Sequence, residues 1–216
     1  MNSSNQPLET LNEIRDLMQR SSKFLSLSGL SGISAGIVAL IGATVAYLRL
    51  KTDTLYDEES AQLAGFTRRQ MMEFVLLDGA IVLVLAIGFG IFFTVRKAKK
   101  AGQPIWNSTS KRVVISLLIP LVTGGIFCLA MFYRGILWVS FPATLIFYGL
   151  ALLNASKYTV RDLEYLGISE VVLGLFSLFL TGYNLLIWAF GFGVLHIIYG
   201  AVMYFKYDRT SSHPQA

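Results

Sequence analysis

The chain has 216 residues, of which 54% are hydrophobic and only 14% are charged. Soluble domains carry about one quarter charged residues, so this composition indicates a polytopic membrane protein and excludes a dinucleotide-binding fold, a nucleic-acid-binding protein and a secreted disulfide scaffold. The net charge of +5 and the pI near 9.3 fit positively charged loops that fix orientation in a bilayer.

Residues 1–23 are predicted to form a cytoplasmic amphipathic helix ahead of the first membrane span. Leu11, Ile14 and Met18 recur at three- or four-residue spacing, which places them on one helix face. Such an apolar face needs a partner. We expect it to lie on lipid or on the helix bundle, or to dock onto a cytoplasmic protein or a second copy of the chain.

Six apolar runs follow, and each has the length and composition of a membrane-spanning helix. The predicted fold class is therefore all-α, with a six-helix transmembrane domain over residues 24–205 and a disordered cytoplasmic tail over residues 206–216. The predicted spans cover residues 24–48, 74–95, 113–133, 136–153, 163–180 and 183–205.

The distribution of Lys and Arg predicts that both termini are cytoplasmic. In the six-span arrangement thirteen of the 18 basic residues fall on the side of the two termini, and the other five fall on the opposite side. The weakest element is the fifth span, which is short and contains Glu164 and Glu170. If that segment failed to cross, the C-terminus would change sides.

Small residues are concentrated in the first predicted span. Ser28, Gly32 and Gly36 are four residues apart, and Ala35 and Ala39 lie on a neighbouring row. Small residues at this spacing allow helix backbones to approach closely, which favours helix association in lipid. We expect this helix to be the packing centre of the bundle.

The sequence RSSKFLSLSGLSGISAG, from Arg20 to Gly36, resembles the opening of a group of uncharacterised multi-spanning bacterial inner-membrane proteins. The resemblance includes part of the preceding amphipathic helix. It implies a location in the bacterial inner membrane, and it implies no particular activity.

Ionisable side chains inside membrane spans are energetically expensive, so each is a candidate functional residue. Glu170 lies 12 residues before Gly182 and His196 lies 14 residues after it. Because the last two predicted spans form a hairpin about this glycine, the two side chains should lie at similar depth and can pair. Asp78, near the outer end of the second span, can reach the membrane interface.

The tetrapeptide Gly29-Leu30-Ser31-Gly32 resembles the G-x-S-G nucleophile motif of rhomboid intramembrane proteases, which also have six helices and a histidine on the last. The resemblance implies Ser31 as nucleophile, His196 as base and Glu170 as the group that orients it. In rhomboids the motif lies on the fourth span, whereas here it lies on the first. Close helix packing is the alternative explanation for the serine.

Three functions follow as hypotheses. The first is a non-enzymatic accessory, scaffold or signalling component, whose basic second loop and N-terminal helix face cytoplasmic partners or anionic lipid. The second is a small proton-coupled transporter that uses Glu170 and His196, and the third is an intramembrane serine hydrolase. We expect no metal and no cofactor, because the sequence has no H-E-x-x-H motif and one histidine in a span cannot supply paired haem ligands.

Overall fold

The computed structural model describes residues 28–54, 68–102, 104–180 and 182–209, and these residues form helices and short connections with no strand. The α-helices before the last hairpin are α2 (Gly29–Thr54), α4 (Arg68–Lys100), α5 (Ser108–Tyr133), α6 (Ser140–Ser156) and α7 (Asp162–Ser177). The short 3-10 helix η1 (Leu137–Val139) precedes α6.

The last helical segment is continuous from Asn184 to Asp208, and we call it the terminal helix. It consists of four consecutive elements. These are α8 (Asn184–Ala189), the π-helix η2 (Phe190–Leu195), α9 (His196–Met203) and the π-helix η3 (Tyr204–Asp208).

Five helices of the described chain are long and apolar enough to cross a membrane: Gly29–Leu50, Gln70–Lys100, Ser108–Tyr133, Leu137–Ser156 and Asn184–Asp208. They correspond to five of the six predicted spans. The segment predicted as the fifth span forms α7, which has only 16 residues. At about 1.5 Å per residue this helix is shorter than the hydrocarbon core of a bilayer, which is about 30 Å thick.

Several helices extend beyond the apolar runs from which they were predicted. The helix α4 begins six residues before the expected span, and its last turn contains Lys97, Lys99 and Lys100, whose charges favour a helix C-terminus. The helix α5 begins earlier because Asn107 and Ser110 form a reciprocal capping box. The amphipathic helix expected over residues 1–23 lies outside the described residues.

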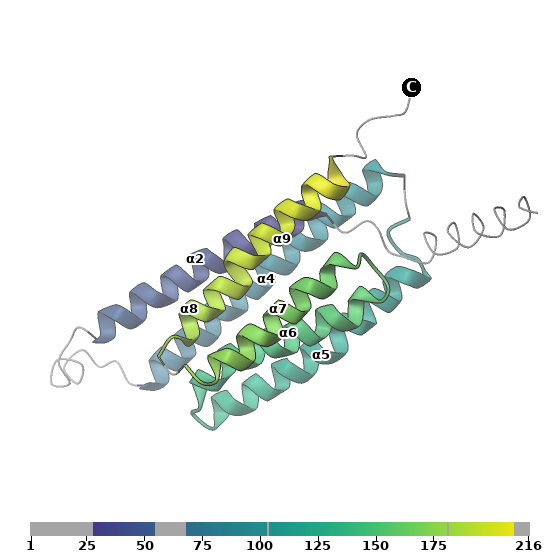
Figure 1. Cartoon of the computed structure of the whole chain (residues 1–216). Helices are drawn as coiled ribbons and strands as arrows, with labels where there is room; N and C mark the ends of the chain where they lie inside the picture. The colour runs from purple at the N-terminus through teal and green to yellow at the C-terminus, as the bar shows by residue number, and fades with distance from the viewer. Residues whose placement is uncertain (1–27, 55–67, 103, 181, 210–216) are drawn as a thin grey trace, which may run out of the picture.

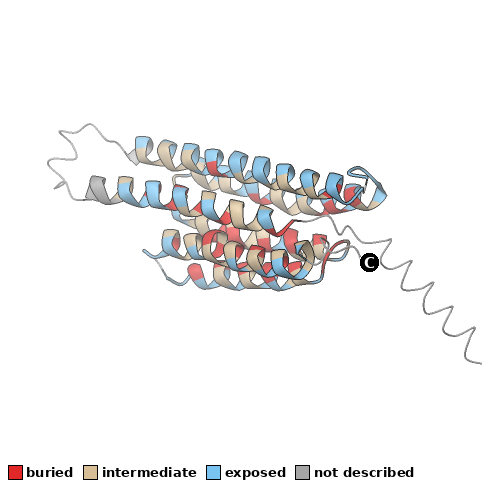
Figure 2. Cartoon of the chain, turned by 90° about the horizontal axis from the view of Figure 1, so that it is seen from above, coloured by how far each residue is buried: buried red, intermediate tan, exposed pale blue. Residues whose placement is uncertain are grey.

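Two groups of helices make up the bundle (Figure 1). In one group, α2 packs against α4 and the terminal helix. In the other group, α6 packs against α5 and α7, and contacts from α6 and α7 to the terminal helix join the groups. The flanking helices α4 and α5 are mostly exposed. Only 6% of the apolar 18-residue stretch of α4 and 11% of that of α5 are buried. Figure 2 shows this outward exposure along the bundle.

Glycines bring α2 and the terminal helix into backbone contact. A Cβ at Gly32 would lie 3.0 Å from the Cα of Gly200, and a Cβ at Gly36 would lie 2.6 Å from the carbonyl oxygen of Gly193. A Cβ at Gly200 would lie 2.5 Å from the backbone nitrogen of Ile33. These helices therefore pack at a distance that only glycine permits, as small-residue interfaces do in lipid.

The turn between α7 and the terminal helix contains Gly182, whose φ of +94° is in the left-handed region that glycine adopts without strain. This turn makes the hairpin tight. As a result, α7 and the terminal helix are antiparallel neighbours. Residues equally distant from Gly182 in the sequence lie at similar depth in the bundle.

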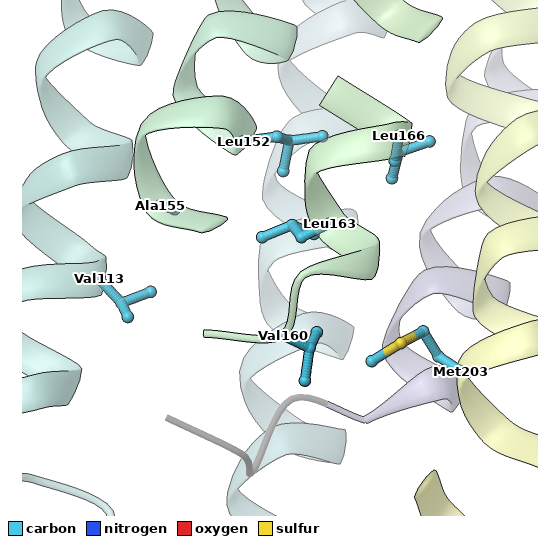
Figure 3. Packing of buried hydrophobic residues seen from close by; sticks show 7 residues of the cluster. All are labelled: Val113, Leu152, Ala155, Val160, Leu163, Leu166 and Met203. Atoms are coloured by element: carbon cyan, nitrogen blue, oxygen red, sulfur yellow. The ribbon is translucent and has the colours of Figure 1, made fainter. Parts of the chain in front are cut away.

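A buried apolar cluster lies at the end of the bundle opposite this turn, and Figure 3 shows its side chains at close range. It joins the start of α5, the end of α6, the start of α7 and the end of α9. Its members are Val113, Leu152, Ala155, Val160, Leu163, Leu166 and Met203.

Two carboxylates hold the same end together. Asp208 accepts hydrogen bonds of 3.0 Å from the hydroxyl of Ser28 and from the backbone N–H of Gly29, and it forms a 2.7 Å ion pair with Lys97. One side chain thereby links the start of α2, the end of α4 and the end of the terminal helix.

The second carboxylate, Asp162, accepts hydrogen bonds of 2.7 Å from Lys206 Nζ and from the Tyr207 hydroxyl. Partial burial of Asp162 opposes ionisation, but these two hydrogen bonds hold its pKa below the ordinary value. The terminal helix continues to Asp208, so residues 206–208 of the predicted tail are helical.

Candidate functional site

The hairpin brings Glu170 of α7 and His196 of the terminal helix together in the interior. Glu170 is 0% exposed and His196 is 4% exposed. The Nδ1 atom of His196 lies 3.3 Å from Oε1 of Glu170. Neither carboxyl oxygen of Glu170 receives a well-formed hydrogen bond from the described residues. His196 is therefore the nearest group that can neutralise a charge on this carboxyl.

Both ring nitrogens of His196 have an oxygen neighbour. Nδ1 lies 3.0 Å from the carbonyl oxygen of Gly191, and Nε2 lies 2.9 Å from the hydroxyl of Tyr148 on α6. A carbonyl oxygen can only accept, so Nδ1 carries a hydrogen and faces two acceptors, the Gly191 carbonyl and the Glu170 carboxyl. This arrangement assigns the tautomer of the neutral ring.

On the other side of the ring, the hydrogen bond between the Tyr148 hydroxyl and Nε2 can reverse its direction. When the ring is neutral, the hydroxyl donates to Nε2, and when the ring is cationic, Nε2–H donates to the hydroxyl oxygen. The His196 ring can therefore gain or lose a proton at Nε2 without moving a heavy atom. This is the main chemical capability of the site.

Gly191 makes room for the carboxyl group of Glu170. A Cβ at this glycine would lie 2.6 Å from Glu170 Oε2 and 2.7 Å from Leu145 Cδ2. Gly191 also belongs to the π-helix η2, which ends immediately before His196. Such π-segments widen a helix locally and are frequent at functional sites.

Aromatic side chains surround the ring of His196. Phe192 stacks on it with ring centroids 5.7 Å apart and an interplanar angle of 18°. Trp188 packs against Phe192, and its indole nitrogen donates a 3.1 Å hydrogen bond to the hydroxyl of Thr144. Thr144 and Tyr148 lie one turn apart on α6. They contact Trp188 and His196, which lie two turns apart on the terminal helix.

The pair can hold one proton in two forms, as an ion pair or as a neutral acid beside a neutral ring. Complete loss of that proton would leave an ionised carboxyl buried without a counter-charge, which is strongly unfavourable. Release of the proton therefore requires that water or another donor reach Glu170.

The Ser31 hydroxyl bonds within its own helix, although the neighbouring Gly32 packs against the backbone of His196. This hydroxyl donates a 2.5 Å hydrogen bond to the carbonyl oxygen of Ser28. In the described structure no hydrogen bond joins Ser31 to His196 or Glu170. The three residues predicted for a hydrolase thus do not form a Ser–His–carboxylate array.

Asp78 lies on α4 and faces α2 rather than the Glu170–His196 pair. Its Oδ2 atom lies 3.5 Å from the position that a Cβ at Gly42 would occupy. None of the ion pairs between described residues includes Asp78.

The predicted packing residues of the first span occupy two kinds of position. Gly32 and Gly36 face the backbone of the terminal helix, and Ala39 is buried at 3% exposure, whereas Ala35 is half-buried. Ser28 bonds to Asp208 instead of packing as a small side chain.

Four residues were not predicted from the sequence: Tyr148 and Gly191 at the pair, and the carboxylates Asp162 and Asp208 at the end of the bundle. The four-residue spacing of Thr144 with Tyr148 and the eight-residue spacing of Trp188 with His196 each place two side chains on one helix face, which is the signal that could have paired these helices. No group of three His, Cys, Asp or Glu residues in the described ranges is arranged to hold a metal ion.

Comparison of the chain with protein-family models, curated proteins and solved structures finds no match. The chain is thus a helical protein with five membrane-length helices and a buried carboxyl–imidazole pair.

Proposed function

We propose that the chain is a six-span protein of the bacterial inner membrane with both termini in the cytoplasm. The contact of Asp208 with Ser28 supports an even number of crossings, because it holds the start of α2 and the end of the terminal helix at one end of the bundle. In this proposal α7 crosses together with the turn that follows it. Its first residue, Asp162, bonds to Lys206 and Tyr207 at that end.

The other end of α7 supports the same path. Ser177 donates a 2.8 Å hydrogen bond to Asn184, at the start of the terminal helix, and both side chains are buried. The distribution of Lys and Arg supports a cytoplasmic location for the end that contains Asp208. A reporter domain that is active only in the cytoplasm should be active when it is fused to either terminus. Opposite locations for the two termini would reject the proposal.

Within this topology, we propose that the protein is a small proton-coupled transporter in which Glu170 and His196 carry the coupling proton. The observation that supports this is the fully buried carboxyl 3.3 Å from His196 Nδ1, in a span that would otherwise exclude an ionisable group. The reversible Tyr148 hydrogen bond lets the ring change charge, and proton release requires an opening of the bundle. An obligatory link between proton release and opening is what coupled transport needs.

The proton site is tested by nuclear magnetic resonance of the reconstituted protein. The chain has two histidines, so a His213→Gln background labelled with a heavy nitrogen isotope in histidine leaves His196 as the only signal. We expect Nε2 to change between neutral and cationic signals as the pH is varied. In Glu170→Gln the ring should stay neutral over the same range, because its counter-charge is gone.

The matched control is Glu164→Gln, which removes a carboxyl from the same helix where the side chain is 45% exposed. It should leave the His196 signal unchanged. A ring that titrates identically in wild type and Glu170→Gln would contradict the proton site.

Transport itself is tested by screening small solutes for uptake into vesicles under an imposed pH gradient. Wild type and Glu164→Gln should show gradient-driven uptake of the same solutes, and Glu170→Gln should lose it. Uptake in Glu170→Gln that still follows the pH gradient would reject Glu170 as the coupling group.

A non-enzymatic accessory, scaffold or signalling role is the second candidate. The observation that favours it is the glycine-mediated backbone contact between α2 and the terminal helix, which suits a bundle of fixed shape. Under this alternative the Glu170–His196 contact only stabilises the fold, and Glu170→Gln changes stability without changing any pH-dependent signal of His196.

A further inference from the structure

The connection between α4 and α5 is the most concentrated basic region of the described chain. Residues 96–112 contain six Lys or Arg residues and no Asp or Glu. One of the six, Lys97, pairs with Asp208. The other five are exposed, and no ion pair joins them to a described residue. They are Arg96, Lys99, Lys100, Lys111 and Arg112.

Apolar side chains lie next to these five cations. Trp106 is 64% exposed, and Lys111 Nζ lies 5.9 Å from the centroid of its ring. Exposed tryptophans of this kind are typical of the membrane–water interface, where the indole ring sits among lipid headgroups.

The helices on either side of the connection present exposed apolar faces. Phe92, one turn before Arg96, is 57% exposed, and Ile115, one turn after Lys111, is 56% exposed. A molecule bound here would meet cations at one end and apolar helix faces at the other. That combination fits an amphiphile with an anionic head and acyl chains, and a soluble anion would use only the cations.

We propose that the five cations and Trp106 form a binding site for the headgroup of an anionic phospholipid, with its acyl chains against α4 and α5. This proposal relies on the topology proposed above only to place the lipid in the inner leaflet. Basic clusters next to a membrane span attract anionic lipids, with a contribution of about fivefold in affinity for each basic residue near the surface.

Charge argues against the other occupants of this surface. A second copy of the chain docked through the same surface would bring the same five cations against them, and like charges repel. Residues 1–27 contain three acidic and three basic residues, so this segment offers no net negative charge. The anionic lipid supplies the missing negative charge.

The site is tested by native mass spectrometry of the intact protein titrated with phosphatidylglycerol, and with phosphatidylcholine as the zwitterionic reference. We expect phosphatidylglycerol to bind more tightly. The double variants Lys99→Gln/Lys100→Gln and Lys111→Gln/Arg112→Gln should each weaken its binding about tenfold or more. Binding of phosphatidylcholine should not change.

The matched control is Lys157→Gln/Arg161→Gln, which removes the same charge from another connection at the same end. It should weaken phosphatidylglycerol binding less than twofold, and Lys99→Arg/Lys100→Arg should retain it. An equal effect of the control double variant would mean that only the overall surface charge matters, and this would overturn the site.

Two further measurements distinguish related outcomes. Glycerol phosphate in excess should not displace the lipid, because it lacks acyl chains, and displacement would identify a site for soluble phosphate instead. The Glu170→Gln variant should bind phosphatidylglycerol as wild type does, so failure of the transport proposal would leave this result unchanged.

Discussion

Replacing Gly200 by Ala tests whether backbone contact between α2 and the terminal helix stabilises the bundle. The added Cβ would lie 2.5 Å from Ile33 N, 2.7 Å from Gly29 O and 2.9 Å from the carbonyl carbon of Gly32. All three atoms belong to the backbone, so no side-chain rotation relieves the contact. Overpacking costs about 1–3 kcal/mol, and rigid backbone neighbours place this change in the upper half of that range.

The matched control is Gly88→Ala on α4, where a Cβ would meet nothing within 4 Å. Both substitutions gain the same helix propensity, about 1 kcal/mol, so the difference between the variants isolates the packing cost. For a chain of this size about 1 kcal/mol corresponds to 2–4 °C in Tm, which predicts a difference of about 4–12 °C.

The assay is thermal unfolding of the reconstituted protein, followed by tryptophan fluorescence, to which Trp188 contributes from its position between the terminal helix and α6. Gly88→Ala should unfold at or above the wild-type temperature, and Gly200→Ala should unfold well below it. Equal transition temperatures for the two variants would refute the claim that the glycine contact is tight.

Two other predictions concern the carboxylates. Because the pKa of Asp162 is lowered in the folded protein, its hydrogen bonds stabilise the fold fully above the ordinary value of 3.8, and this contribution is lost as the pH falls through the lowered pKa. Asp162→Asn should therefore flatten the acid side of a plot of Tm against pH, and an unchanged slope would argue against the contact. In Gly191→Ala, the new Cβ would be 2.6 Å from Glu170 Oε2, so we expect a stability loss of about 1–3 kcal/mol and an altered His196 resonance, and a wild-type resonance would contradict this.

The helical class and the positions of the membrane-length helices could be predicted from sequence, because apolar run length is a direct consequence of bilayer thickness. The ends of the helices were less predictable. Hydropathy detects only the part that matches hydrocarbon, whereas α4 and α5 continue into polar sequence that is stabilised by terminal lysines and by the Asn107 capping box.

The Glu170–His196 pair was predictable because a tight turn at Gly182 fixes the depth of residues on either side. The depth of Ser31 in the bundle does not predict whether it reaches the Glu170–His196 pair, because depth does not determine which face of a helix a side chain occupies. Tyr148 was not predicted because its contact depends on the lateral position of α6 beside the terminal helix, which the depth of a residue in the bundle does not determine.

The bond between Ser28 and Asp208 joins residues 180 positions apart. In the proposed membrane topology, the hairpin of α2 and α4 would enter the bilayer long before the last segment leaves the ribosome. Its glycine-rich surface has no backbone partner until then. A nascent chain arrested before Asn184 would expose Gly29, Gly32 and Gly36 to lipid. Because the terminal helix is synthesised last, its insertion is the step that completes the packing of α2.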